Sequence, residues 1–203
     1  MNEENYTGYH GTNNVAAQKI IEENQFIPSK DKKTKLYLGR GVYFYIEYKD
    51  AISWNIKGYK YDNEKYPNLE ELNQQYDIIN VDIVVLKDNI LNLNKVENIK
   101  IFDELTNEIR GKLVTKPEYK YARNKNGAII NYLMKLKLLT DVDMIIRNIK
   151  DPILDSDIHS MNDIYRKVIC VKNLNIIKNI SMHEKVTIED FKIVNYFYGD
   201  KVK

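Results

Sequence analysis

The segment Tyr76 to Leu86 constrains the fold more than any other part of the chain. Its apolar residues Val81, Ile83 and Val85 occupy every second position, and this period of two is typical of a β-strand with one buried face. It is the clearest strand in the sequence. The chain is therefore expected to contain a β-sheet with an apolar face.

The other segments alternate irregularly between strand and helix patterns. Further strands are predicted at Tyr6–Tyr9, Gly41–Tyr45, Val142–Ile146, Val168–Val171 and Val186–Tyr198, the last of which could be broken. Helices are predicted at Val15–Asn24, Glu47–Ile56, Leu69–Gln74, Phe102–Leu113 and Ala128–Leu138, the first capped by Asn13 or Asn14. Because no regular strand–helix–strand alternation is present, the sequence predicts an α+β fold with a mainly antiparallel sheet rather than a doubly wound fold.

The length and the net charge of the chain bear on its number of domains and on its binding partners. The chain has 203 residues, which predicts a single domain over residues 1–203. The formal net charge of +2 is close to balance and gives no argument for binding to nucleic acid or to a membrane. No apolar run approaches the roughly 20 residues of a membrane span.

The single cysteine, Cys170, excludes a disulfide within the chain and favours a reducing compartment. It lies in the apolar run Val168–Val171, which indicates a buried strand residue rather than a catalytic thiol. The amino-terminal residues 1–5 are polar and acidic, unlike a signal peptide. A cytoplasmic location is expected.

The first segment that can carry chemistry is His10-Gly11-Thr12, at the end of a predicted strand. The histidine supplies a donor or acceptor near neutral pH. The glycine lets a ligand approach the backbone, and the threonine adds a hydroxyl. Three kinds of polar contact are thus available at one place.

The second segment is Gly39-Arg40-Gly41-Val42-Tyr43-Phe44, followed by Trp54 on a predicted helix. Tyr43 and Trp54 could enclose a flat ligand such as nicotinamide. No third glycine opens the following helix, so the segment is not a dinucleotide-binding fingerprint of the Rossmann type.

Together and in this order, the two segments resemble the poly(ADP-ribose) polymerase-like branch of the diphtheria-toxin-like ADP-ribosyltransferases. That branch, of the His-Tyr-Glu class, has His-Gly followed by Ser or Thr on its first catalytic strand. A Gly-x-Gly-[Ile or Val]-Tyr-Phe strand comes next, and a second aromatic residue follows that tyrosine by eleven positions, where this chain has Trp54. The resemblance covers about residues 8 to 55. It implies a fold of split antiparallel sheets flanked by helices.

The resemblance also implies a substrate and roles for the site residues. The substrate would be NAD⁺, with no metal. The backbone of Gly11 would hold the nicotinamide carboxamide, and His10 would bond a ribose hydroxyl. Tyr43 and Trp54 would stack on the nicotinamide ring, with Thr12 and Gly41 completing the binding site. His10 and Tyr43 are the expected catalytic residues.

Two positions depart from the family pattern. Ala51 stands where the family often has a serine that bonds the carboxamide, so Ser53 could supply that bond. Lys167 stands where a strand should begin with the family's glutamate, and Asp163 and Glu184 are alternative acidic partners out of register. Relatives that lack the glutamate tend to transfer one ADP-ribose or none, so mono-ADP-ribosylation is expected.

The acceptor is left open between protein and nucleic acid. If it is nucleic acid, the basic, tyrosine-containing segment Thr115–Asn126 and the segment Lys30–Lys35 are where it would bind. A toxin–antitoxin or phage-defence effector, with an antitoxin protein as partner, is one expectation. The alternatives are an NAD⁺ glycohydrolase and a catalytically inactive binding module. His159 and His183 are isolated and are expected to be surface or hydrogen-bonded residues, not metal ligands.

Overall fold

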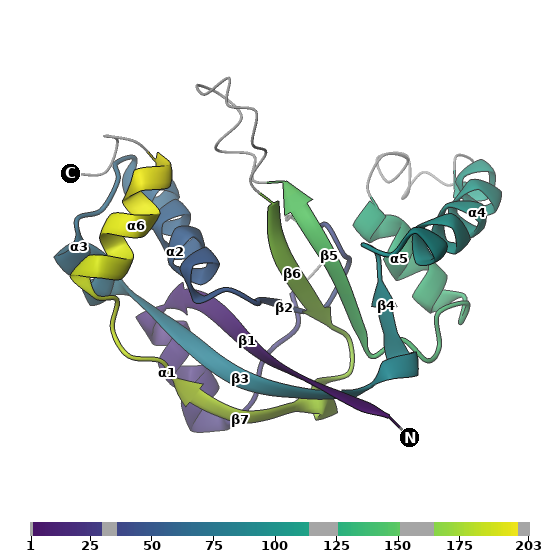
Figure 1. Ribbon diagram of the computed structural model, residues 1–203, viewed down its shortest axis with the longest axis horizontal. Helices are drawn as coiled ribbons and strands as arrows, with labels where there is room; N and C mark the ends of the chain where they lie inside the picture. The colour runs from purple at the N-terminus through teal and green to yellow at the C-terminus, as the bar shows by residue number, and fades with distance from the viewer. Residues whose placement is uncertain (1, 30–35, 114–125, 151–164, 199–203) are drawn as a thin grey trace.

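The computed structural model describes residues 2–29, 36–113, 126–150 and 165–198. Within these ranges the chain is a mixed α+β protein, as predicted, with helices packed around one mainly antiparallel sheet (Figure 1). The strands are β1 (Glu3–Asn13), β2 (Val42–Tyr45), β3 (Tyr76–Leu86), β4 (Ile90–Asn92), β5 (Met144–Lys150), β6 (Tyr165–Val171) and β7 (Ile177–Met182). The helices are α1 (Asn14–Glu23), α2 (Tyr48–Asn63), α3 (Leu69–Gln75), α4 (Val96–Leu113), α5 (Asn126–Lys135) and α6 (Ile188–Tyr198).

The sheet has the order β4-β5-β6-β2-β1-β3-β7, and only β4 and β5 pair in parallel among these strands. The sheet falls into two halves, one of β4, β5, β6 and β2 and the other of β1, β3 and β7. The joint between them is the pairing of β1 with β2. Strands β1 and β3 pair along their whole length, from Glu3 opposite Leu86 to Asn13 opposite Tyr76. Strands β1 and β2 meet at a single residue pair, Tyr9 opposite Tyr45. The two halves therefore diverge beyond Tyr9, and this divergence makes room for a site.

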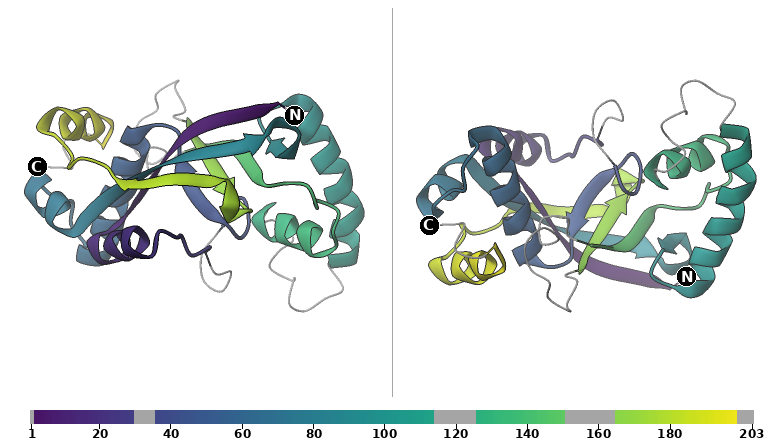
Figure 2. Two further views of the ribbon diagram at one scale, coloured as in Figure 1. Left: turned by 90° about the horizontal axis from the view of Figure 1, so that it is seen from below. Right: turned by 90° about the horizontal axis from the view of Figure 1, so that it is seen from above.

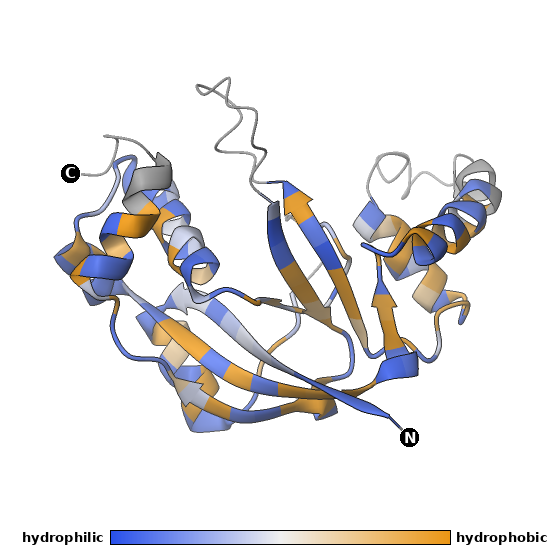
Figure 3. Cartoon of the chain, in the orientation of Figure 1, coloured by the Kyte–Doolittle hydropathy of each residue, from blue (hydrophilic) through white to orange (hydrophobic). Residues whose placement is uncertain are grey.

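The helices gather at two ends of the sheet. Helices α2, α3 and α6 lie together at one end, and α4 and α5 lie at the other, in all three views (Figures 1 and 2). Helix α1 lies against β1, β3 and β7. Strand hydropathy alternates along β3, where orange and blue residues follow one another (Figure 3). Val81, Ile83 and Val85 are buried, so the pattern in the sequence marks the packed face.

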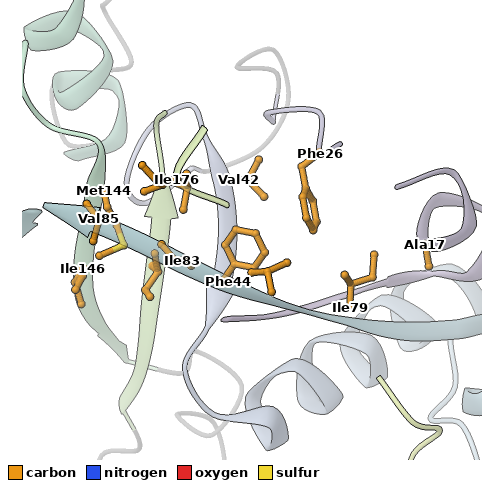
Figure 4. Close-up of a cluster of buried hydrophobic side chains, with 13 residues drawn as sticks. Ala17, Phe26, Val42, Phe44, Ile79, Ile83, Val85, Met144, Ile146 and Ile176 are labelled. Atoms are coloured by element: carbon orange, nitrogen blue, oxygen red, sulfur yellow. The ribbon is translucent and has the colours of Figure 1, made fainter. Parts of the chain in front are cut away.

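The largest apolar cluster lies beside the joint between the two halves. Phe26, from the segment after α1, packs edge-on against Phe44 of β2, with the ring centroids 5.1 Å apart. Val42, Ile79 and Ile83 surround this pair (Figure 4). Burying such side chains is worth about 1.5–3 kcal/mol each. The position of β2 next to β1 is thus fixed mainly by packing, since only one residue pair joins the two strands.

The start of α1 follows the predicted cap. The side chain of Asn13 accepts a hydrogen bond from the backbone N–H of Ala16 at 2.9 Å, as an N-cap asparagine does. Cys170 is buried on β6, as predicted, and burial raises the pKa of its thiol. The remaining predicted strands and helices up to Val171 are present, with ends shifted by a few residues or more.

The predicted strand at Val186–Tyr198 is wrong, because residues 188–198 form helix α6. Thr187 precedes the helix, and its hydroxyl accepts from the N–H of Asp190 at 3.2 Å and donates to the Asp190 carboxylate at 2.8 Å. Phe191 and Val194 are buried three positions apart, which is helical spacing. The N-terminal cap and the acidic first turn favour a helix here, although the β-branched and aromatic residues favour a strand.

Strands β4 and β7 were not predicted. Strand β7 lies at the edge of the sheet and has no fully buried residue, so its sequence lacks a strong alternation. Among the described residues, no helix is long and apolar enough to cross a membrane. The segments Lys30–Lys35 and Thr115–Asn126, apart from Asn126 itself, lie outside the described residues, as do His159 and Asp163.

Candidate functional site

A cavity of about 560 Å³ opens where β1 and β2 diverge. Its walls come from the end of β1, helix α1 and the segment after it, strand β2, helix α2 and the neighbouring ends of β5 and β6. Six of the seven predicted site residues line it: His10, Gly11, Thr12, Gly41, Tyr43 and Trp54. Residues up to 44 positions apart in sequence are therefore brought to one cavity.

His10 joins the two halves of the sheet. Its Nδ1 lies 2.8 Å from the carbonyl oxygen of Tyr43, and because a carbonyl oxygen only accepts, Nδ1 carries the proton. Phe26 and Phe44 pack edge-on against the ring at 5.4 and 5.9 Å. Burial lowers the pKa of His10, partly opposed by the hydrogen bond to Tyr43. The imidazole is thus neutral near pH 7, with Nε2 as an acceptor.

Gly11 is a place where the chain comes close to helix α2. A Cβ at this position would lie 2.7 Å from the carbonyl oxygen of Ala51 and also collide with Oδ1 of Asn55. Asn55 in turn donates from Nδ2 to the carbonyl oxygen of Asp77 at 3.0 Å. The glycine is required for this packing, and Ala51, the residue in place of the family's serine, is part of the wall behind it.

The hydroxyl of Tyr43 holds the turn that precedes β2. It donates to the carbonyl oxygen of Gly39 at 2.6 Å and accepts from the backbone N–H of Leu38 at 3.0 Å. Gly39 has φ +76°, a left-handed conformation that favours glycine. The hydroxyl is therefore engaged within the protein, and the ring of Tyr43 is the part that a ligand can contact.

Two further side chains fix the same turn, and sequence reasoning missed both. Lys172 Nζ donates to the carbonyl oxygens of Leu38 and Arg40 at 2.6 and 2.7 Å. Asn131 on α5 accepts from the N–H of Arg40 at 2.6 Å. No local signal marks these residues, because their partners lie about 90 to 134 positions away. The turn is thus held from both sides.

Trp54 contributes an exposed indole to the cavity wall. Its relative exposure is 53%, which is high for a large apolar side chain. Its ring lies 6.4 Å from that of Tyr45, at an interplanar angle of 47°. Tyr45 also lines the cavity and was not predicted, although its position two residues after Tyr43 places both on the same face of β2.

Ser53 is the one predicted site residue outside the cavity lining. Its exposure is 4%, and it faces the interior on the buried side of α2. Asp50, Trp54 and Lys57 are spaced by four and three residues, so they lie on one side of α2. Trp54 and Lys57 of this side line the cavity. The prediction that Ser53 supplies a missing carboxamide bond is therefore not supported by its position.

Lys167, the residue at the family's acidic position, does not line the cavity. On β6, Arg166 and Val168 line the cavity, while Lys167 between them is exposed on the other face. Glu184 does not line the cavity and lies near Tyr48, whose pKa is raised to about 12 by burial together with Asp190 and Glu184. Among the described lining residues, Glu23 carries the sole carboxylate. Its Oε1 lies 3.7 Å from Nζ of Lys19.

His183, predicted to be a surface or hydrogen-bonded residue, stacks on Tyr48 with ring centroids 4.2 Å apart. Its Nδ1 lies 3.1 Å from the carbonyl oxygen of Glu184. In the described part of the chain, no group of three His, Cys, Asp or Glu side chains could hold a metal ion.

Comparison with known proteins finds one similar chain over nearly the full length. An archaeal protein from Methanocaldococcus jannaschii, named "Uncharacterized protein MJ0359", is 26% identical, with 96% of this chain and 95% of that one covered. No protein-family model matches the sequence, and no solved structure matches it. The chain is thus similar to a protein of nearly equal extent, and its cavity has to be interpreted from its own residues.

Proposed function

We propose that this chain is a mono-ADP-ribosyltransferase of the kind that its motifs resemble. It would cleave NAD⁺ at the nicotinamide–ribose bond and transfer ADP-ribose to a macromolecular acceptor, a protein or a nucleic acid. The observation that carries the proposal is that six predicted residues from three separate segments line one cavity. Its volume of about 560 Å³ is within the range typical of small-molecule sites.

Three aromatic residues of the cavity lining, here called the aromatic wall, favour a planar, cationic ligand. Tyr43, Tyr45 and Trp54 all line the cavity. The faces of such rings attract cations by their quadrupole, and the nicotinamide ring of NAD⁺ carries a positive charge. The ring would stack here, with its carboxamide toward the backbone of Gly11, where β1 has already separated from β2.

His10 supports the ribose end of the same ligand. Its proton is on Nδ1, in the hydrogen bond to Tyr43, so a ribose hydroxyl would donate to Nε2. Because burial lowers the pKa of His10, this acceptor persists at neutral pH. A cation at this point would oppose the positive charge that develops on the ribose as nicotinamide leaves.

The transfer itself is a substitution at the ribose carbon. The carbon–nitrogen bond to nicotinamide breaks, and both electrons go to the ring nitrogen, which becomes neutral. An acceptor nucleophile forms the new bond to that carbon and releases its proton to water. The site contributes by holding NAD⁺ in a reactive conformation, so its rings and its backbone matter more than any acid.

The cavity wall also supports a single transfer rather than chain growth. The cavity-facing positions of β6 are Arg166 and Val168, and neither can orient a second ribose as a carboxylate would. The same observation favours the alternatives of an NAD⁺ glycohydrolase, with water as acceptor, and of a non-catalytic binding module. The reduced, buried Cys170 fits a cytoplasmic location.

One assay separates these functions. The protein is incubated with NAD⁺ labelled in its adenylate part and with cell extract, and free nicotinamide and macromolecular label are followed. The transferase is expected to give both signals, and both should be lost in His10→Ala. His183→Ala, which changes a histidine outside the cavity, is the matched control and should retain them. Nicotinamide alone would indicate the hydrolase, and neither signal would remove the enzymatic proposal.

A further inference from the structure

Basic side chains from three elements line one side of the cavity. They are Lys57 of α2, Lys150 of β5 and Arg166 of β6, here called the basic wall. With Lys19, the described lining residues include four cations against one carboxylate, Glu23. Lys19 and Glu23 lie 3.7 Å apart and offset one another. The other three cations of the described lining are those of the basic wall.

Arg166 gives this wall a fixed charge. Its side chain is only 8% exposed, and Nη1 donates to Oδ1 of Asp50 at 3.0 Å and to the Asp50 carbonyl oxygen at 3.3 Å. Asp50 stands in the first turn of α2 and does not line the cavity. The carboxylate therefore orients the guanidinium from behind. A guanidinium held in this way suits a phosphate, which it recognises by charge and by its planar set of donors.

Lys150 lines the cavity from the end of β5. In the antiparallel register of β5 and β6, Ile149 lies opposite Arg166, and Lys150 follows it at the end of the strand. Lys167, the neighbour of Arg166, is on the opposite face of β6 and does not line the cavity. Arg166 thus faces the cavity by the alternation of side chains along β6, and Lys150 lines it where β5 ends, opposite Tyr165.

The basic wall adjoins the aromatic wall along α2. Lys57 follows Trp54 by three residues, which places it on the same side of the helix and about 4.5 Å further along the axis. In NAD⁺ one ribose separates the nicotinamide ring from the diphosphate. A ligand whose ring stacks at Trp54 would thus bring its diphosphate toward Lys57, and on to Lys150 and Arg166.

We infer that the basic wall of Lys57, Lys150 and Arg166 binds the diphosphate of the dinucleotide, an inference that rests on the proposed function for the orientation of the ligand. Within a cavity of low dielectric constant, such charges act more strongly than on an open surface. The wall would give the site its preference for a diphosphate-linked nucleotide over free nicotinamide or a nucleoside.

The test measures binding of ADP-ribose, inorganic pyrophosphate and nicotinamide by calorimetry, in the full chain and without turnover. Lys57→Gln with Lys150→Gln should weaken binding of ADP-ribose and pyrophosphate at least tenfold and leave nicotinamide binding within twofold. Lys167→Gln, which removes one positive charge from a residue of β6 outside the cavity, should leave all three unchanged. Because the affected lysines are not in the core, the melting temperature of the double variant should stay close to that of the parent.

The outcomes separate this inference from the proposed function. If ADP-ribose binds through the two lysines but NAD⁺ is never cleaved, the basic wall stands and the transferase proposal fails. If NAD⁺ is cleaved and the double variant binds ADP-ribose as tightly as the parent, the basic wall is overturned alone. A single-stranded oligonucleotide that binds through Lys57 and Lys150 while ADP-ribose does not would also overturn it, in favour of a nucleic-acid ligand.

Discussion

The imidazole of His10 and the backbone of Tyr43 are joined across the joint between the two halves of the sheet. Nδ1 of His10 donates to the carbonyl oxygen of Tyr43 at 2.8 Å, one residue beyond the single pair Tyr9–Tyr45 that links β1 to β2. One side chain therefore both braces the joint and faces the cavity. Its protonation state should affect stability as well as ligand binding.

Acid should destabilise the protein through His10. Burial lowers the folded-state pKa of His10 below its ordinary value of 6.5. The unfolded chain thus takes up a proton first as the pH falls, and stability contributed by the neutral ring is lost between about pH 6.5 and the folded-state pKa. Urea denaturation from pH 7.5 to 5 should show a smaller decrease in unfolding free energy for His10→Gln than for the parent. Equal pH dependence in both proteins would contradict the assignment.

Tyr43→Phe should separate the two roles of Tyr43. The variant keeps the ring but removes the hydroxyl that bonds both Gly39 and Leu38. Leaving those backbone groups unpaired should cost about 1–3 kcal/mol of unfolding free energy. NAD⁺ binding should weaken as the turn loosens, whereas Tyr43→Ala should abolish turnover. An unchanged denaturation midpoint for Tyr43→Phe would show that the hydroxyl does not hold the turn.

Gly11→Ala should push α2 away from β1. The added methyl group would meet the backbone oxygen of Ala51 at 2.7 Å, and backbone cannot move aside as a flexible side chain can. Overpacking of this kind costs about 1–3 kcal/mol. Gly58→Ala, on α2 itself, is the control, since its methyl group would meet the side chain of Tyr76 at 3.1 Å and no backbone atom among its nearest neighbours. Thermal denaturation should show a clear loss for Gly11→Ala alone.

The sequence predicts features that depend on neighbours along the chain. The cap at Asn13 and the buried alternation of β3 are local patterns, and both are confirmed. The resemblance assigned His10 and Tyr43 to one site, and both line the same cavity. Helix α6 was mistaken for a strand because its composition favours strands, while the Thr187 cap that starts it is a weaker signal.

Features that depend on register could not be predicted in the same way. The family resemblance put Lys167 at the expected acidic position, but the alternation of side chains along β6 places Arg166 at the cavity and Lys167 on the other face. A shift of one residue reverses the face of a strand. Lys172 was missed because its partners Leu38 and Arg40 lie 134 and 132 positions away in the sequence.

The sole tryptophan provides a direct reporter of the ligand ring. Trp54 lines the cavity, so saturating NAD⁺ should quench its fluorescence. Trp54→Ala should raise the dissociation constant of NAD⁺ several-fold, since stacking is worth about 0.5–1.5 kcal/mol beyond burial, and Trp54→Tyr should restore part of the loss. Absence of any quench at saturation, with binding verified by calorimetry, would place the ligand ring elsewhere.

Removing one charge of the ion pair between Asp50 and Arg166 should lower the unfolding free energy. Its side chains are 18% and 8% exposed, and removal of one partner from a buried pair costs about 3–5 kcal/mol because the other charge stays buried. Asp50→Asn should therefore reduce the unfolding free energy strongly, and Asp50→Asn with Arg166→Gln should recover part of the loss. Lys65→Gln removes one charge from a surface pair whose lysine is 61% exposed and should cost much less, because solvent screens exposed ion pairs. Urea denaturation of the parent and the three variants measures all of these differences. If Asp50→Asn is no more damaging than Lys65→Gln, the carboxylate does not hold the guanidinium at the cavity wall.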